Sequence, residues 1–131
     1  MEEASLAYPS LDDALALHAI VMGIAAERAM GHVRDLNLLE SALARPRNEA
    51  AYEDASLLRQ AASLLWGVVK NHPFVDGNKR TGYVLMETFL DVNGVVVLAT
   101  EDAKFELVVA VAGTHDFAID DVEHWLTGHT S

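Results

Sequence analysis

The stretch HPFVDGNKRT, residues His72–Thr81, decides the fold because it has the pattern of a sharp corner between two helices. Pro73 disfavours the α-helical region for the residue before it, so the preceding helix should stop at His72. Gly77 permits a tight turn or a positive φ, and Asn78 is a favoured residue at a helix start. The stretch therefore predicts a helix, a short turn and a second helix.

Apolar residues at helical spacing predict further helices on both sides of this corner. Ser10 and Asp35 are expected to cap the first two helices, and Pro46 should end the second, leaving a loop over Arg45–Asn48. The expected helices cover residues 11–31, 36–45, 52–71, 78–92, from 100 onward and 120–128. Val95–Leu98 is β-branched and short, which indicates an extended segment. The chain is thus predicted to be an all-α bundle of about six helices in one domain, residues 1–131.

Composition excludes several classes of protein. The chain has 131 residues, no cysteine and a formal net charge of −11. Without cysteine there is neither a disulfide framework nor a thiolate site, which fits a cytoplasmic location. The negative charge disfavours direct binding to nucleic acid or an anionic membrane, and no apolar run is long enough for a membrane span.

The corner also predicts an anion site. The first amides of a helix have no partner within it, and they sit at the positive end of the helix dipole. Lys79 and Arg80 occupy this first turn, where the dipole disfavours a cation by about 0.3–1 kcal/mol each. A bound polyphosphate would reverse that penalty, because both side chains bind phosphate oxygens.

Two further residues complete a set suited to phosphoryl or nucleotidyl transfer. Asp76 can hold a Mg²⁺ ion that bridges phosphate oxygens. His72 can take a proton from a hydroxyl near neutral pH. On the residues alone, a plain helical corner with a solvated histidine and two solvated cations explains the stretch about equally well.

The same residues resemble the signature of the Fic/Doc superfamily, His-x-Phe-x-(Asp/Glu)-(Gly/Ala)-Asn-x-Arg. The ending Asn-Lys-Arg-Thr is similar to the Doc branch, the death-on-curing toxins of toxin–antitoxin pairs. Residues 33–46 and the Phe89–Gly94 segment also resemble that branch. The resemblance implies a protein with a Fic/Doc-like helical fold, whose cofactors are ATP and Mg²⁺.

Residue roles follow from this resemblance position by position. His72 resembles the general base that acts on a target hydroxyl, and Phe74 the residue that packs the loop into the core. Asp76 matches the acidic position for Mg²⁺. The phosphate-binding positions of the motif are matched by Gly77, Asn78, Lys79 and Arg80.

Departures from the Fic pattern bear on which group is transferred. AMP-transferring Fic proteins have Gly at position 79 and a second Arg at position 83, where this chain has Lys79 and Tyr83. Lys79 is typical of the Doc branch, which implies transfer of the γ-phosphate to elongation factor Tu and arrest of translation. Gly77 is Fic-like, so AMP transfer stays an alternative, as does a non-catalytic module that binds a nucleotide or peptide. A cognate antitoxin is the implied partner, with an amphipathic helix in an apolar groove.

Overall fold

The computed structural model describes residues 5–113 and 115–131, which form six α-helices and one 3₁₀ helix. In order they are α1 (Leu11–Met22), η1 (Ala26–His32), α2 (Leu36–Glu53), α3 (Leu57–Asn71), α4 (Asn78–Val92), α5 (Glu101–Gly113) and α6 (Ile119–His129). No β-strand occurs in the described ranges, so the predicted all-α class is confirmed.

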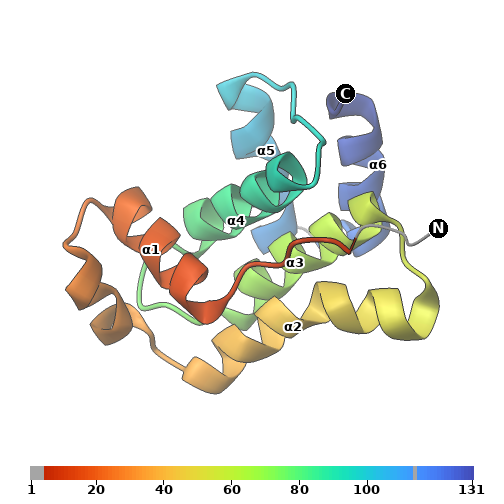
Figure 1. The fold of residues 1–131 in the computed structure, drawn as a ribbon. Helices are drawn as coiled ribbons and strands as arrows, with labels where there is room; N and C mark the ends of the chain where they lie inside the picture. Colours follow the sequence, from red (N-terminus) through yellow and green to blue (C-terminus); the bar gives the residue numbers. More distant parts are fainter. Residues whose placement is uncertain (1–4, 114) are drawn as a thin grey trace.

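Helix α3 is the centre of the bundle (Figure 1). It packs against α2 on one side, α4 on another, and α5 and α6 beyond them. Most of its residues are buried, and Leu64, Leu65 and Val68 are fully so. Gly67 lets α2 approach closely, since a Cβ at Gly67 would lie 3.2 Å from the Cβ of Ala42. The corner after α3 is therefore anchored to the central, mostly buried helix of the fold.

The first predicted helix is too long, because a glycine stop within it was missed. Helix α1 begins as predicted, with the Ser10 hydroxyl accepting the N–H of Asp13. It ends at Met22, and Gly23 follows in the left-handed conformation with φ 66°. Glycine at this position relieves the strain of a positive φ, which makes it a common helix stop. The chain then turns into η1, whose buried residue is Ala29.

The predicted loop at Arg45–Asn48 is wrong, since Pro46 lies inside α2. Pro46 is buried in the bundle, and the neighbouring Arg45 donates from Nε to the hydroxyl of Ser63 on α3 at 3.1 Å. Packing of this face against α3 outweighs the lost backbone hydrogen bond. Helix α2 therefore continues to Glu53, and α3 begins at Leu57 rather than Tyr52, capped by Ser56.

The C-terminal third follows the prediction with small shifts. The Thr100 hydroxyl accepts the N–H of Ala103 at the start of α5, as expected for a cap. Helix α6 begins at Ile119 rather than at residue 120, and its capping carboxylate is Asp121, which accepts the N–H of Ala118. Val95–Leu98 is extended and pairs with the chain end through an isolated bridge between Val97 and Thr130.

No single helix in the described part of the chain is long and apolar enough to cross a bilayer; α1 and η1 meet this test only together, and they are bent by 99°.

Candidate active site

The catalytic candidate His72 lies exposed at the end of α3, in the left-handed conformation with φ 53° and ψ 52°. The helix stops there as predicted, and the His72 N–H still bonds to the carbonyl of Val68. A positive φ is uncommon for a residue with a side chain, and such conformations concentrate at functional sites. The surroundings must therefore hold His72 in place.

Arg34 supplies much of that support from the linker between η1 and α2. Its Nε donates to the His72 carbonyl at 2.8 Å, and its Nη2 donates to the Asn71 carbonyl at 3.1 Å. The backbone N–H of Arg34 also donates to the carbonyl of Pro73 at 2.7 Å. Arg34 thus caps the C-terminus of α3, where a cation complements the helix dipole.

Phe74 packs the connector into the core, as the resemblance implied. It is fully buried, and its ring stacks on the imidazole of His18 from α1. An isolated bridge pairs Phe74 with Val33, and the neighbouring Val75 N–H donates to the carbonyl of His32 at 2.8 Å. The connector is thus held from both sides, and it presents His72 and Asp76 to solvent.

Asn78 closes the loop through its side chain. Its Oδ1 accepts the Phe74 N–H and its Nδ2 donates to the Phe74 carbonyl, both at 2.9 Å and both buried. The amide side chain is therefore committed to the loop, and the group that Asn78 can offer an anion is its backbone N–H. Gly77, rather than Asn78, is the N-cap residue of α4, with φ 77°.

The predicted anion site lies at the N-terminus of α4, and residues 77–80 are called the anion turn below. The first bond of this helix runs from the Thr81 N–H to the Gly77 carbonyl at 2.9 Å. The N–H groups of residues 78–80 precede that bond and have no partner within the helix. The Gly77 N–H is directed instead to Asp76, whose Oδ1 accepts it at 2.8 Å.

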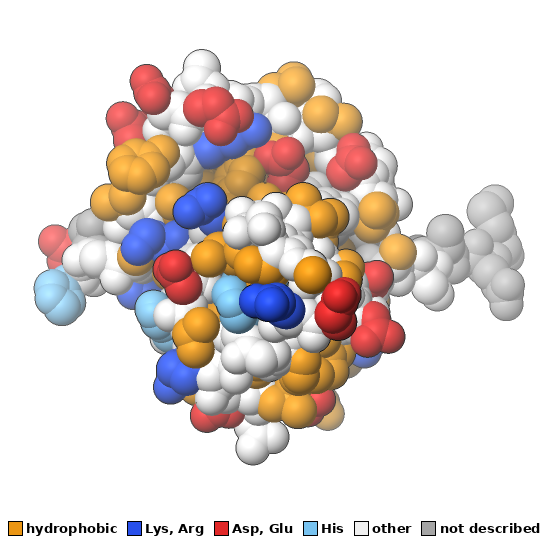
Figure 2. Space-filling view, turned by 90° about the vertical axis from the view of Figure 1, so that its left-hand side faces the viewer, with side chains coloured by type: hydrophobic (Ala, Val, Ile, Leu, Met, Phe, Trp, Pro, Cys, Tyr) orange, Lys and Arg blue, Asp and Glu red, His pale blue; other side chains and the backbone are white. Residues whose placement is uncertain are grey.

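Lys79 and Arg80 are exposed on the first turn of α4 and line one pocket between α4 and α5. Within the described residues, neither side chain forms an ion pair with a carboxylate. Figure 2 shows one face of the molecule, on which Lys and Arg side chains lie close to His side chains, interspersed with hydrophobic and acidic ones. Lys70, by contrast, lies over the Trp66 ring, with its Nζ 4.8 Å from the ring centroid, and lines a separate pocket.

His18 is not singled out by any motif in the sequence, and it packs from α1 beneath the connector. It is fully buried, with its Nδ1 2.9 Å from the Thr81 hydroxyl and its Nε2 3.3 Å from Nδ1 of His32. Burial, and next the neighbouring His32, lower the pKa of His18 to about 4, against a smaller opposing effect of Asp76. His18 is therefore neutral at pH 7 and acts as packing beneath the loop. Its helical spacing alone carried no signal of these partners.

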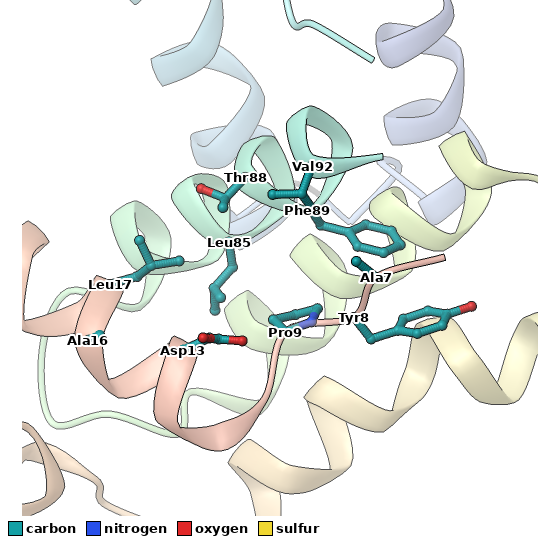
Figure 3. A pocket seen from close by; sticks show the side chains of 10 residues that line it. All are labelled: Ala7, Tyr8, Pro9, Asp13, Ala16, Leu17, Leu85, Thr88, Phe89 and Val92. Carbon is teal, nitrogen blue, oxygen red and sulfur yellow. The ribbon is translucent and has the colours of Figure 1, made fainter. Parts of the chain in front are cut away.

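An apolar groove lies on another side of α4 (Figure 3). It runs between the segment before α1, α1 itself and α4, and has a cavity volume of about 330 Å³. Leu17, Leu85 and Phe89 line it, and Asp13 stands among these apolar side chains. The groove shares α4 with the anion turn, whose cations line a different pocket.

Comparisons with known proteins agree with this geometry. The model of the Fic/DOC family matches residues 8–90, which include α1, α2, α3 and the whole connector. Toxin Doc of Mycolicibacterium smegmatis is 39% identical over 99 residues, which cover 73% of this chain and 76% of that protein. The chain therefore belongs to the Fic/DOC family, within its Doc branch.

Proposed function

We propose that this protein is a Doc-like toxin of a toxin–antitoxin pair, which transfers a phosphate from Mg-ATP to a hydroxyl of a translation factor. Elongation factor Tu is the expected target, and the cytoplasm is the expected location. Family membership supports a transferase of the Fic/Doc type, and the Toxin Doc relative supports the toxin role. The observation that carries the proposal is an exposed His72 shortly before the N-terminus of α4, where Lys79 and Arg80 pair with no carboxylate among the described residues.

In this mechanism His72 takes the proton of the acceptor hydroxyl as its oxygen attacks the γ-phosphorus of ATP. The bond to the β,γ-bridging oxygen breaks, and ADP leaves. Lys79, Arg80 and the free amides of residues 78–80 stabilise the charge on the transferring group. The bond from Arg34 to the His72 carbonyl would hold the backbone of the base in place during this step.

The residues present fit a Mg²⁺ ion that arrives with the nucleotide. No group of three or more His, Asp or Glu in the described ranges could hold a metal by itself. Mg²⁺ is typically bound by one or two carboxylates, with phosphates and water completing its shell. Asp76 is exposed, and its Oδ1 accepts the Gly77 N–H. Its other carboxylate oxygen is available to the ion. When bound, Mg²⁺ would neutralise part of the negative charge on the phosphates of the nucleotide.

The transferred group is decided by incubating the protein with elongation factor Tu and ATP labelled at either the α- or the γ-phosphate. The proposal predicts that the label reaches the target from γ-labelled ATP only. Label from α-labelled ATP would show AMP transfer and refute the phosphate version. Label from neither form, on this target and on a panel of other translation factors, would refute the enzymatic function and favour a binding module.

A cognate antitoxin is the proposed partner, and the groove between α1 and α4 is its proposed binding site. The apolar walls suit an amphipathic helix, and Asp13 favours a basic residue on it. Ala16 lies exposed in this groove, so Ala16→Glu should prevent neutralisation by the co-expressed antitoxin while toxicity persists. The matched control is Ala51→Glu, the same substitution at an exposed alanine of α2 that does not line the groove. Full neutralisation of Ala16→Glu would exclude this groove.

A further inference from the structure

The pocket between α4 and α5 extends the anion turn along α4. Its cavity volume is about 480 Å³, within the range of small-molecule sites. Lys79 and Tyr83 are four residues apart on α4, so their side chains share one face of the helix. From α5, Lys104 places its Nζ 5.6 Å from the centroid of the Tyr83 ring. The pocket thus brings a third cation, distant in sequence, next to Lys79 and Arg80.

Tyr83 supplies an independent sign that this pocket takes a polar ligand. Its side chain lines the pocket and the residue is only 8% exposed, yet its hydroxyl makes no hydrogen bond to any described residue. Burial, and next the nearby Glu87, raise the pKa of Tyr83 far above its usual value, so the hydroxyl keeps its proton. The only acceptor beside this hydroxyl among the described residues is the Glu87 carboxylate, which lies outside normal hydrogen-bond geometry, so an acceptor oxygen from a ligand can compete for the donor.

Lys104 is held in the pocket by two carboxylates that a stronger anion can replace. Its Nζ lies 3.4 Å from Glu87 and 3.5 Å from Glu101, and the Glu101 side chain is 91% exposed. Exposed ion pairs of this kind contribute little, because water and salt screen them. A phosphate carries more charge and more acceptor oxygens than the carboxylate of Glu101. Exchange of Glu101 for a phosphate is therefore favourable.

We propose that this pocket binds the phosphate chain of the nucleotide, with Lys104 and the Tyr83 hydroxyl as phosphate contacts in addition to Lys79 and Arg80. The inference rests on the proposed function in taking a nucleoside triphosphate as the ligand. It assigns α5 a part in substrate binding, and it gives Glu101 a specific role as a competitor for Lys104. Removing the charge of Lys104 should then weaken polyphosphate binding, and removing the charge of Glu101 should strengthen it.

Calorimetric titration of the full chain with Mg-ATP, inorganic triphosphate and adenosine tests this directly. Lys104→Gln should weaken binding of both polyphosphates about five- to tenfold, and Lys104→Arg should restore it. Glu101→Gln should strengthen polyphosphate binding about two- to threefold, because Lys104 loses a competing partner. Binding of adenosine should not change in any variant. Lys70→Gln is the matched control, since Lys70 lines a different pocket.

Several results would overturn the inference. Equal polyphosphate affinity in Lys104→Gln and the wild type would remove Lys104 from the site. Parallel losses in Lys104→Gln and Glu101→Gln, tracked by circular dichroism, would show that the pair only joins α4 to α5. An equal loss for adenosine would place the nucleoside rather than the phosphates at Lys104. Absence of any polyphosphate binding by the wild type would refute ATP use itself, and the proposed function with it.

Discussion

The imidazole of His18 lies flat against the ring of Phe74, with the two centroids 3.8 Å apart and the ring planes 4° from parallel. Through this stack α1 supports the connector that carries His72 and Asp76. The same imidazole reaches α4 through the Thr81 hydroxyl and η1 through His32. One buried side chain of α1 therefore contacts the connector, α4 and η1, which surround the candidate active site.

This burial predicts how stability depends on pH. The native pKa of His18 is about 4, whereas the unfolded chain keeps the ordinary value of 6.5. Between these values the unfolded state binds a proton that the native state does not, so the free energy of unfolding rises with pH across this window. The contribution reaches at most about 3 kcal/mol and is constant above pH 6.5.

Urea denaturation of the wild type and His18→Phe at pH 4.5, 5.5 and 7 measures this contribution. Phenylalanine keeps an aromatic ring against Phe74 but cannot titrate. The variant should lose the part of the pH dependence that His18 supplies, and the difference between the two proteins should be smallest at low pH. A pH dependence unchanged by the substitution would show that His18 titrates normally in the folded protein.

Asn78→Ala should destabilise the protein by about 2–4 kcal/mol, because it leaves the buried N–H and carbonyl of Phe74 without partners. Asn93 makes a similar pair of bonds with the backbone of Ala7 at an exposed site, where water can replace them. Asn93→Ala should therefore cost clearly less in the same denaturation experiment. Equal losses would mean that burial of the Asn78 pair contributes nothing.

Much of the fold followed from local signals. Ser10, Asp35 and Thr100 cap the predicted helices through side-chain oxygens, and Pro73 ends α3 at the expected residue. Each of these features depends on residues within four positions of each other in the chain. Such local patterns can be recognised in one sequence without knowledge of the fold. The corner at residues 72–77 was predicted for the same reason.

The features that escaped prediction depend on contacts between distant segments. Pro46 stays inside α2 because its face packs on α3, which local preference opposes. The roles of Arg34 and His18 come from partners 38 and 63 residues away in the chain. Asn78 was predicted to cap the helix that it starts, but its side chain bonds to the backbone of Phe74 and the N-cap is Gly77. Periodicity cannot reveal such pairings.

Arg34→Met should lower the transfer rate about 10- to 100-fold, because His72 would lose the side chain that fixes its backbone. The KM for ATP should stay near the wild-type value, since Arg34 bonds to the end of α3 and not to the anion turn. Arg28→Met, an exposed change on η1, is the control and should behave as wild type. A rise in KM without a fall in kcat would contradict a positioning role for Arg34.

Asp54→Gly should stabilise the protein by up to about 1 kcal/mol. Asp54 ends α2 in the left-handed conformation with φ 52°, which strains a residue with a side chain, and its charge opposes the helix dipole. Asp54→Asn removes the charge alone and should give a smaller gain. A lower midpoint of thermal unfolding for Asp54→Gly would show that the entropy of glycine outweighs the relief of strain.

The most direct test of the central claim compares transfer of the γ-phosphate to the target protein by the wild type and by His72→Asn. Asparagine tolerates the left-handed conformation at this position, so the loop should keep its shape while the base is lost. We predict that the wild type labels the target and that the folded variant, although it still binds Mg-ATP, labels it at least about 100-fold more slowly. Transfer by His72→Asn at the wild-type rate would contradict the assignment of His72 as the base.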